Sequence, residues 1–140
     1  MSMKDFPVGQ EMEVTYPPFK VHLTIQSATE LIFAIREGEF ARTERVEIQV
    51  VPIANSVFVV SWKESNGATV VNVQDYARGV FQSFVTLASG EFWRMTGSVV
   101  VTRPANKVSD DRDARSARAQ SQGQSPGSAR AVRTRRAPRY

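Results

Sequence analysis

Cysteine is absent from the 140-residue sequence, and histidine occurs once, at His22. These absences exclude disulfide bonds, thiol nucleophiles, thiolate metal sites and any metal site that needs several histidines from one chain. No apolar run approaches the roughly 20 residues of a membrane helix, and Lys4 and Asp5 interrupt the start where a secretory signal would be apolar. There is also no glycine-rich phosphate loop. We therefore expect a cytoplasmic protein with no membrane span, no cofactor and no metal.

Positive charge is concentrated at one end of the chain. Residues 105–140 carry nine Lys or Arg against three Asp, a net charge of +6 within an overall +4, so residues 1–104 carry −2. The same segment has few large apolar side chains and cannot bury enough surface to offset the entropy cost of ordering. We expect an N-terminal segment over 1–9, one domain over 10–104 and a disordered basic tail over 105–140. A solvated extension is the favoured role of the tail, and weak nonspecific contact with anionic surfaces is the alternative.

Between these ends, apolar and polar residues alternate in short segments separated by turn residues. This period of two predicts eight strands, at residues 11–16, 19–25, 29–37, 43–52, 56–64, 68–76, 80–87 and 91–102. The segment that starts at Ser27 could also form a short amphipathic helix, but its β-branched and aromatic residues favour a strand. Links of a few residues allow only antiparallel neighbours, because parallel crossovers need a dozen or more residues.

The expected fold is therefore all-β, a single antiparallel up-and-down barrel of about eight strands similar to the barrels of lipocalins and calycins. Closing the sheet removes its exposed edges and leaves an interior for packed side chains or one small ligand. A two-layer sandwich is the alternative, although it usually needs longer crossing connections than this sequence has.

The strand predicted over 56–64 indicates which side chains point inward. Its bulkier and more apolar face consists of Phe58, Val60, Trp62 and Glu64. A carboxylate in an apolar interior is costly without a partner, so Glu64 should hold a cation or hydrogen-bond donor, or act as a proton donor. The alternative is that Glu64 belongs to a solvated hairpin end beside Asn66.

The residues that we expect to contact a ligand are Phe58, Trp62, Phe81, Phe84 and Arg94. Trp93 and Arg94 fall on opposite faces of one strand, and the sequence does not decide which of them points inward. His22 is expected at the surface or rim, with a cavity proton donor as the alternative. Asp75 precedes a turn, where a turn hydrogen bond is more typical than a catalytic role.

The segment VFVVSWKESNGATVVNVQDYARGVFQSFVTLASGEFWRMTGSV, residues 57–99, resembles the MoaF-related family of small barrels. In that family a hairpin of the form VSWxE…G…VV…D…G precedes a strand with a G-x-F motif and a late glycine. The matching residues are Ser61, Trp62, Glu64, Gly67, Val70, Val71, Asp75, Gly79, Gly90, Phe92 and Gly97. The likeness extends more loosely to residue 10, and it implies a calycin-like barrel without a defined biochemical role.

The same hairpin is similar, more weakly, to the SWTEPTG hairpin of phenolic acid decarboxylases, which are small dimeric barrels that need no cofactor. This resemblance implies a homodimer and a site in which Glu64 donates a proton to the alkene of an aromatic acid. Tyr16 would grip the carboxylate, and Arg42 would stand beside the substrate. The first tyrosine of the family's Tyr-x-Tyr pair falls on Val14, which offers no hydrogen-bond donor.

The sequence thus predicts a protein that binds a small aromatic or amphipathic molecule inside a barrel. The alternative is a cofactor-independent lyase that acts on a small aromatic acid, which requires Glu64, Arg42 and Tyr16 to converge on one cavity. A third hypothesis, an interaction module that works through its tail, requires a barrel filled by side chains.

Overall fold

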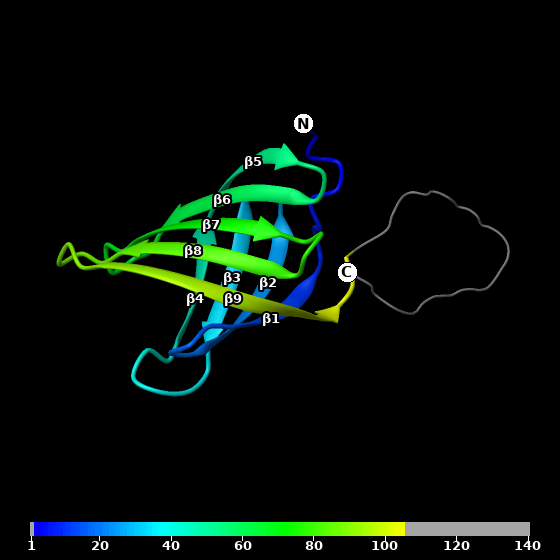
Figure 1. The fold of residues 1–140 in the computed structure, drawn as a ribbon. Helices are drawn as coiled ribbons and strands as arrows, with labels where there is room; N and C mark the ends of the chain where they lie inside the picture. Colours follow the sequence, from blue (N-terminus) through cyan, green and yellow to red (C-terminus); the bar gives the residue numbers. More distant parts are fainter. Residues whose placement is uncertain (1, 106–140) are drawn as a thin grey trace, which may run out of the picture.

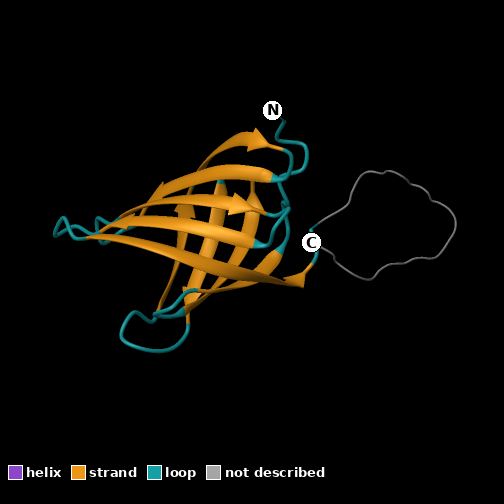
Figure 2. Cartoon of the chain, viewed as in Figure 1, coloured by secondary structure: helices purple, strands orange, loops and turns teal. Residues whose placement is uncertain are grey.

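The computed structural model describes residues 2–105, and all regular secondary structure in that range is β-strand, as predicted. The strands are β1 (Glu11–Thr15), β2 (Lys20–Ser27), β3 (Glu30–Ile35), β4 (Arg42–Glu47), β5 (Gln49–Ala54), β6 (Val57–Lys63), β7 (Thr69–Asp75), β8 (Val80–Thr86) and β9 (Phe92–Arg103). They form one antiparallel sheet in the order β4-β3-β2-β1-β9-β8-β7-β6-β5, which curls into a barrel (Figures 1 and 2). Within residues 2–105 no helix could cross a membrane. The tail predicted over 105–140 lies outside the described residues, except for Ala105.

The strand predicted over 43–52 is divided at Ile48, which raises the strand count from eight to nine. β4 pairs with β3 and β5 pairs with β6, so the chain passes at Ile48 from one end of the sheet order to the other. Ile48 is buried, and its N–H donates to the carbonyl oxygen of Thr29 at 2.9 Å. The alternation of Val46, Ile48 and Val50 continues through this corner because the same face of the chain stays inside.

Packed aromatic side chains close one end of the barrel. Phe58 lies 5.2 Å from Phe6 and 6.2 Å from Tyr76, whose ring in turn lies 5.6 Å from Phe81, measured between ring centroids. All four side chains are buried. This aromatic cluster (Phe6, Phe58, Tyr76 and Phe81) includes a residue from the N-terminal segment, so residues before β1 contribute to the core.

The two end strands of the sheet order, β4 and β5, leave a gap at the other end of the barrel. The first residue of β5, Gln49, pairs with Ser61, so the last residues of β6, Trp62 and Lys63, have no partner on β5. β4 contacts β6 directly in this region. Side chains rather than a backbone ladder therefore join the two ends of the sheet there.

Candidate functional site

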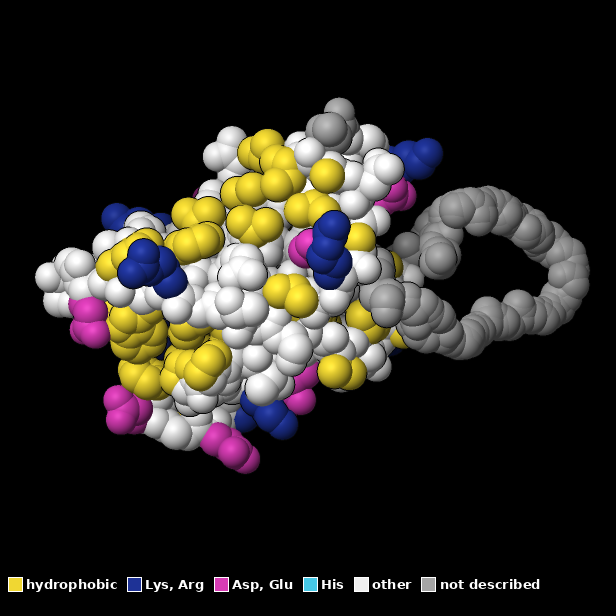
Figure 3. Space-filling model, in the orientation of Figure 1, with side chains coloured by type: hydrophobic (Ala, Val, Ile, Leu, Met, Phe, Trp, Pro, Cys, Tyr) yellow, Lys and Arg dark blue, Asp and Glu magenta, His cyan; other side chains and the backbone are white. Residues whose placement is uncertain are grey.

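A cavity of about 130 Å³ opens at the end of the barrel opposite the aromatic cluster. Its wall is mostly aromatic and aliphatic, and includes Phe19, Phe33, Phe40, Trp62, Trp93 and Met95. These side chains reach one space because that end of the barrel gathers the last residues of β3 and β6 and the first residues of β9. Figure 3 shows hydrophobic side chains at the surface close to the hairpin that joins β8 to β9.

Both tryptophans of the sequence line this cavity. The Trp62 ring stacks on Phe33 with a centroid distance of 6.4 Å and an interplanar angle of 26°. Trp93 meets Phe40 edge to face at 5.2 Å and 82°. The tryptophan emission of the protein therefore comes entirely from the wall of this cavity.

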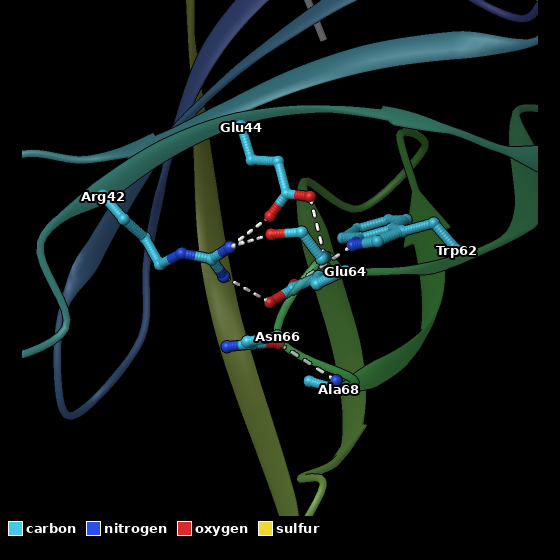
Figure 4. A network of polar contacts seen from close by, with 7 residues as sticks. Arg42, Glu44, Trp62, Glu64, Asn66 and Ala68 are labelled. Carbon is cyan, nitrogen blue, oxygen red and sulfur yellow. Dashed lines mark hydrogen bonds and ion pairs between the residues drawn. The ribbon is translucent and has the colours of Figure 1, made fainter.

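A network of charged side chains stands at the mouth of the cavity (Figure 4). One terminal nitrogen of Arg42, Nη1, donates to Glu64 Oε1 at 2.8 Å, and the other, Nη2, donates to Glu44 Oε1. The remaining carboxylate oxygens accept from the Trp62 indole N–H at 3.1 Å and from the backbone N–H of Ser65 at 2.8 Å. The guanidinium also lies 5.4 Å from the centroid of Phe33. This mouth network (Arg42, Glu44, Trp62, Glu64 and Ser65) links β4 to the end of β6 across the gap in the sheet.

A second polar network runs along the interior from the aromatic cluster to the cavity. The Tyr76 hydroxyl donates to Gln74 Oε1 at 2.5 Å, Gln74 Nε2 donates to Asn72 Oδ1 at 3.1 Å, and Asn72 Nδ2 donates to Ser83 Oγ at 2.9 Å. The last two residues, Asn72 and Ser83, line the cavity together with Tyr16. This interior network therefore delivers polar atoms to the inner part of a wall that is mostly apolar.

Tyr16 holds its phenol at the cavity end of the interior network. Burial raises the pKa of Tyr16 above its ordinary value of 10.0, and hydrogen bonds with the side chains of Ser83 and Asn72 offset part of that rise. The phenol is therefore uncharged at neutral pH.

The Tyr16 ring lies over Gly97, where a Cβ atom would stand 2.8 Å and 2.9 Å from two ring carbons. The absence of a side chain at Gly97 is thus what allows this ring position.

The structure brings together four of the residues predicted for the site. Glu64, Arg42, Tyr16 and Trp62 all line the same cavity. The inward face predicted for the strand that contains Trp62 is confirmed, since Phe58 and Val60 on that face are fully buried.

Four further predicted ligand contacts do not reach the cavity. Phe58 and Phe81 belong to the aromatic cluster at the closed end, where they are fully buried. Phe84 and Arg94 lie on the outside of the barrel, where both contact Phe92, at 6.4 Å between rings and at 5.7 Å from guanidinium to ring. Strand alternation explains this placement, because the neighbours of Phe84 and Arg94 in sequence point inward.

The predictions for the two remaining polar residues are confirmed. His22 lies on the outer face of β2, with Nε2 at 3.3 Å from Glu11 Oε1. Asp75 accepts a hydrogen bond from the backbone N–H of Arg78 at 3.0 Å, which is a turn contact. Among residues 2–105, no group of His, Asp and Glu could hold a metal ion.

Sequence reasoning missed the polar residues at the inner end of the cavity. Asn72 lies two positions after Val70 on an alternating strand, and Ser83 lies two positions after Phe81, so each follows an apolar residue on the inward face. This spacing of two residues could have predicted that Asn72 and Ser83 point into the barrel. Amide and hydroxyl side chains at inward positions of a barrel need partners, which indicates a buried network.

Comparison with known proteins identifies the family of the chain and similar solved structures. The MoaF-like family model matches residues 8–100. A crystal structure of a protein from Burkholderia vietnamiensis, described as a "putative beta-lactamase", superposes with a TM-score of 0.65. The two sequences are 30% identical, and the match covers 68% of this chain and 94% of that one. No curated protein matches the chain.

Proposed function

The chain belongs to the MoaF-like family, and we propose that it binds a small aromatic or amphipathic molecule inside the barrel. The observation that supports this function is the cavity of about 130 Å³ with an aromatic and aliphatic wall. An engineered apolar cavity of roughly 150 Å³ binds benzene, so the space suits a molecule of about one ring. Ligand sites are typically apolar concavities with a few placed polar groups, and here those groups stand at the mouth and at Tyr16.

Tryptophan fluorescence tests this function. We expect a saturable change in emission when one-ring aromatic compounds are titrated into the protein, because Trp62 and Trp93 both line the cavity. The same compounds should raise the melting temperature, since a ligand at 100 times its Kd stabilises the folded state by about 2.7 kcal/mol.

A matched pair of variants distinguishes the cavity from the surface. Val70→Phe places a ring in the cavity, while Val71→Phe places the same ring on the outer face, where Val71 is 40% exposed. The first variant should lose the fluorescence response and the second should keep it. Binding that survives in a folded Val70→Phe protein, or a wild type that responds to no compound, would refute the function.

A cofactor-independent lyase that acts on a small aromatic acid is the second candidate, supported by the convergence of Glu64, Arg42 and Tyr16 on one cavity. Two observations weigh against it. Both oxygens of Glu64 accept hydrogen bonds, from Arg42 and Trp62, and Val14 supplies no second phenol. If the protein is a lyase, Glu64→Gln should reduce turnover about a hundredfold or more while ligand binding persists.

The cavity lacks the groups that would carry out the reaction of a β-lactamase. Hydrolysis of a β-lactam needs an activated serine or a metal-bound water. Ser83 is the serine in the cavity wall, and no Lys or His stands among the described residues of that wall to activate it. A cytoplasmic location, assembly into a homodimer and a relation of the barrel to calycins remain predictions.

A further inference from the structure

The two tryptophan N–H groups and both terminal nitrogens of Arg42 at the cavity mouth already donate to carboxylates of the protein. Both terminal nitrogens of Arg42 donate to Glu44 and Glu64, and the Trp62 N–H donates to Glu64. The Trp93 N–H donates to Glu91 Oε2 at 2.8 Å. Arg42 has further N–H groups and Asn66 has an amide NH2, but a ligand carboxylate that used them would lie beside the carboxylates of Glu44 and Glu64.

The charge balance of the mouth also opposes an anion. One guanidinium stands against the carboxylates of Glu44 and Glu64, which leaves a formal charge of −1. The side chains of Arg42, Glu44 and Glu64 are 29%, 17% and 14% exposed, so their charges are screened less than those of surface groups. The mouth therefore repels a negatively charged ligand and imposes no such barrier on a neutral one.

The inner end of the cavity offers a hydrogen-bond donor without a charge. Ser83 Oγ accepts from Asn72 Nδ2, so the hydroxyl proton of Ser83 remains to be donated. Tyr16, which is hydrogen-bonded with Ser83, brings a second hydroxyl proton. Tyr16 is also hydrogen-bonded with Asn72, whose amide has a second Nδ2 hydrogen that can be donated to the phenol oxygen. One of the two hydroxyl protons then serves the bond between Tyr16 and Ser83, and the other can be donated to an acceptor in the cavity.

We propose that the cavity selects an uncharged one-ring compound whose oxygen accepts a hydrogen bond from the Tyr16 and Ser83 hydroxyl groups, and that it rejects carboxylates. This inference rests on the proposed function and specifies its ligand class. An uncharged oxygen satisfies the donor at the inner end, while the apolar wall encloses the ring. A carboxylate in the same position would be a buried anion without a cation of its own, which is costly.

Three compounds of similar size test the inference: toluene, benzyl alcohol and benzoate. Each is titrated into the full-length protein with tryptophan fluorescence as the readout. We expect benzyl alcohol to bind about fivefold more tightly than toluene, the factor that one net hydrogen bond contributes. Benzoate should bind about tenfold more weakly than toluene, or not at all.

Substitutions at the inner end should remove the preference for oxygen. In the double variant Tyr16→Phe/Ser83→Ala, benzyl alcohol should bind only as tightly as toluene, whereas either single variant leaves one hydroxyl proton for the ligand. Ser61→Ala is the matched control, since it makes the same substitution on the outward face of β6, and it should keep the preference. Glu44→Gln makes the mouth formally neutral, and it should raise the affinity for benzoate relative to toluene about tenfold.

The outcomes separate the ligand class from the function itself. Wild-type protein that binds benzoate more tightly than benzyl alcohol would overturn the inference and leave the binding function standing. So would a folded Tyr16→Phe/Ser83→Ala protein that keeps the preference for benzyl alcohol. A wild type that binds none of the three compounds refutes the proposed function, and the inference with it.

Discussion

Gly97→Ala adds one methyl group at the point where β9 passes beneath Tyr16. The new Cβ would lie 2.6 Å from Val14 Cγ1 and 2.8 Å and 2.9 Å from two carbons of the Tyr16 ring. Carbon atoms pack best at about 3.5–4.0 Å, so the neighbours must move by about 1 Å. Val14 is fully buried, whereas the Tyr16 ring borders the cavity. The ring is therefore the side chain that has space to move.

The cost follows from this overpacking. Extra methyl groups in a packed core typically destabilise proteins by about 1–3 kcal/mol, and the space beside Tyr16 places Gly97→Ala in the middle of that range, at about 2 kcal/mol. Urea unfolding measures the loss directly. Each kcal/mol should also lower the melting temperature by roughly 4–8 °C in a domain of this size. Because the ring shifts into the cavity, the fluorescence response to one-ring ligands should weaken in the same variant.

Ser98→Ala serves as the control, since it introduces the same residue at the next, exposed position of β9. Its stability should stay within about 0.5 kcal/mol of wild type, the usual range for a surface change. A Gly97→Ala protein that loses less than about 0.5 kcal/mol and binds ligand normally would refute the reasoning, because it would show that the Tyr16 ring does not depend on a bare backbone beneath it.

Three further predictions concern the core, the phenol and the tail. Trp62→Ala should lower the free energy of unfolding, measured in urea, by about 3 kcal/mol. This is the lower end of the range for a core aromatic, because the ring borders a cavity. A loss below about 1 kcal/mol would show that the ring lies outside the barrel. The raised pKa of Tyr16 means that the folded state holds its phenolic proton more tightly than the unfolded state, so stability should fall as pH rises above about 10. Tyr16→Phe should fall less steeply between pH 9 and 11, and identical slopes would contradict the burial of the phenol. A chain truncated after Pro104 should still melt cooperatively, because strands β1 to β9 end at Arg103; loss of the transition would show that the tail is needed for folding.

Alternation along the chain was sufficient to predict most of the fold and one face of the site. The period of two along β6 correctly predicted that Trp62 and Glu64 lie on the same inward face as Phe58. The short links correctly predicted antiparallel neighbours. The division at Ile48 was not predictable in this way, because periodicity reports which face is inside and carries no information on which strand is the neighbour.

The misplaced aromatic residues have a different physical reason. Phe81 and Phe84 are three positions apart on one strand, so they must point to opposite faces. Side-chain size does not show which of two phenylalanines points inward. That depends on the side chains that each one contacts on neighbouring strands. Phe84 finds the exposed ring of Phe92 on the outer surface, whereas Phe81 completes the aromatic cluster inside.

Glu64 serves the fold and the cavity at once, and this dual role determines which substitutions are informative. β5 reaches β6 only as far as Ser61, so the ion pair between Arg42 and Glu64 substitutes for the missing backbone ladder at the mouth. Removing one partner of a partly buried pair leaves the other without compensation and destabilises the fold. A change at Glu64 can therefore lower stability as well as turnover, and lost turnover in Glu64→Gln indicates chemistry only when its unfolding curve matches wild type. Ser83 and Tyr16 stand at the opposite end of the cavity from this network, so the effect of their joint substitution on ligand preference is independent of the gap in the sheet.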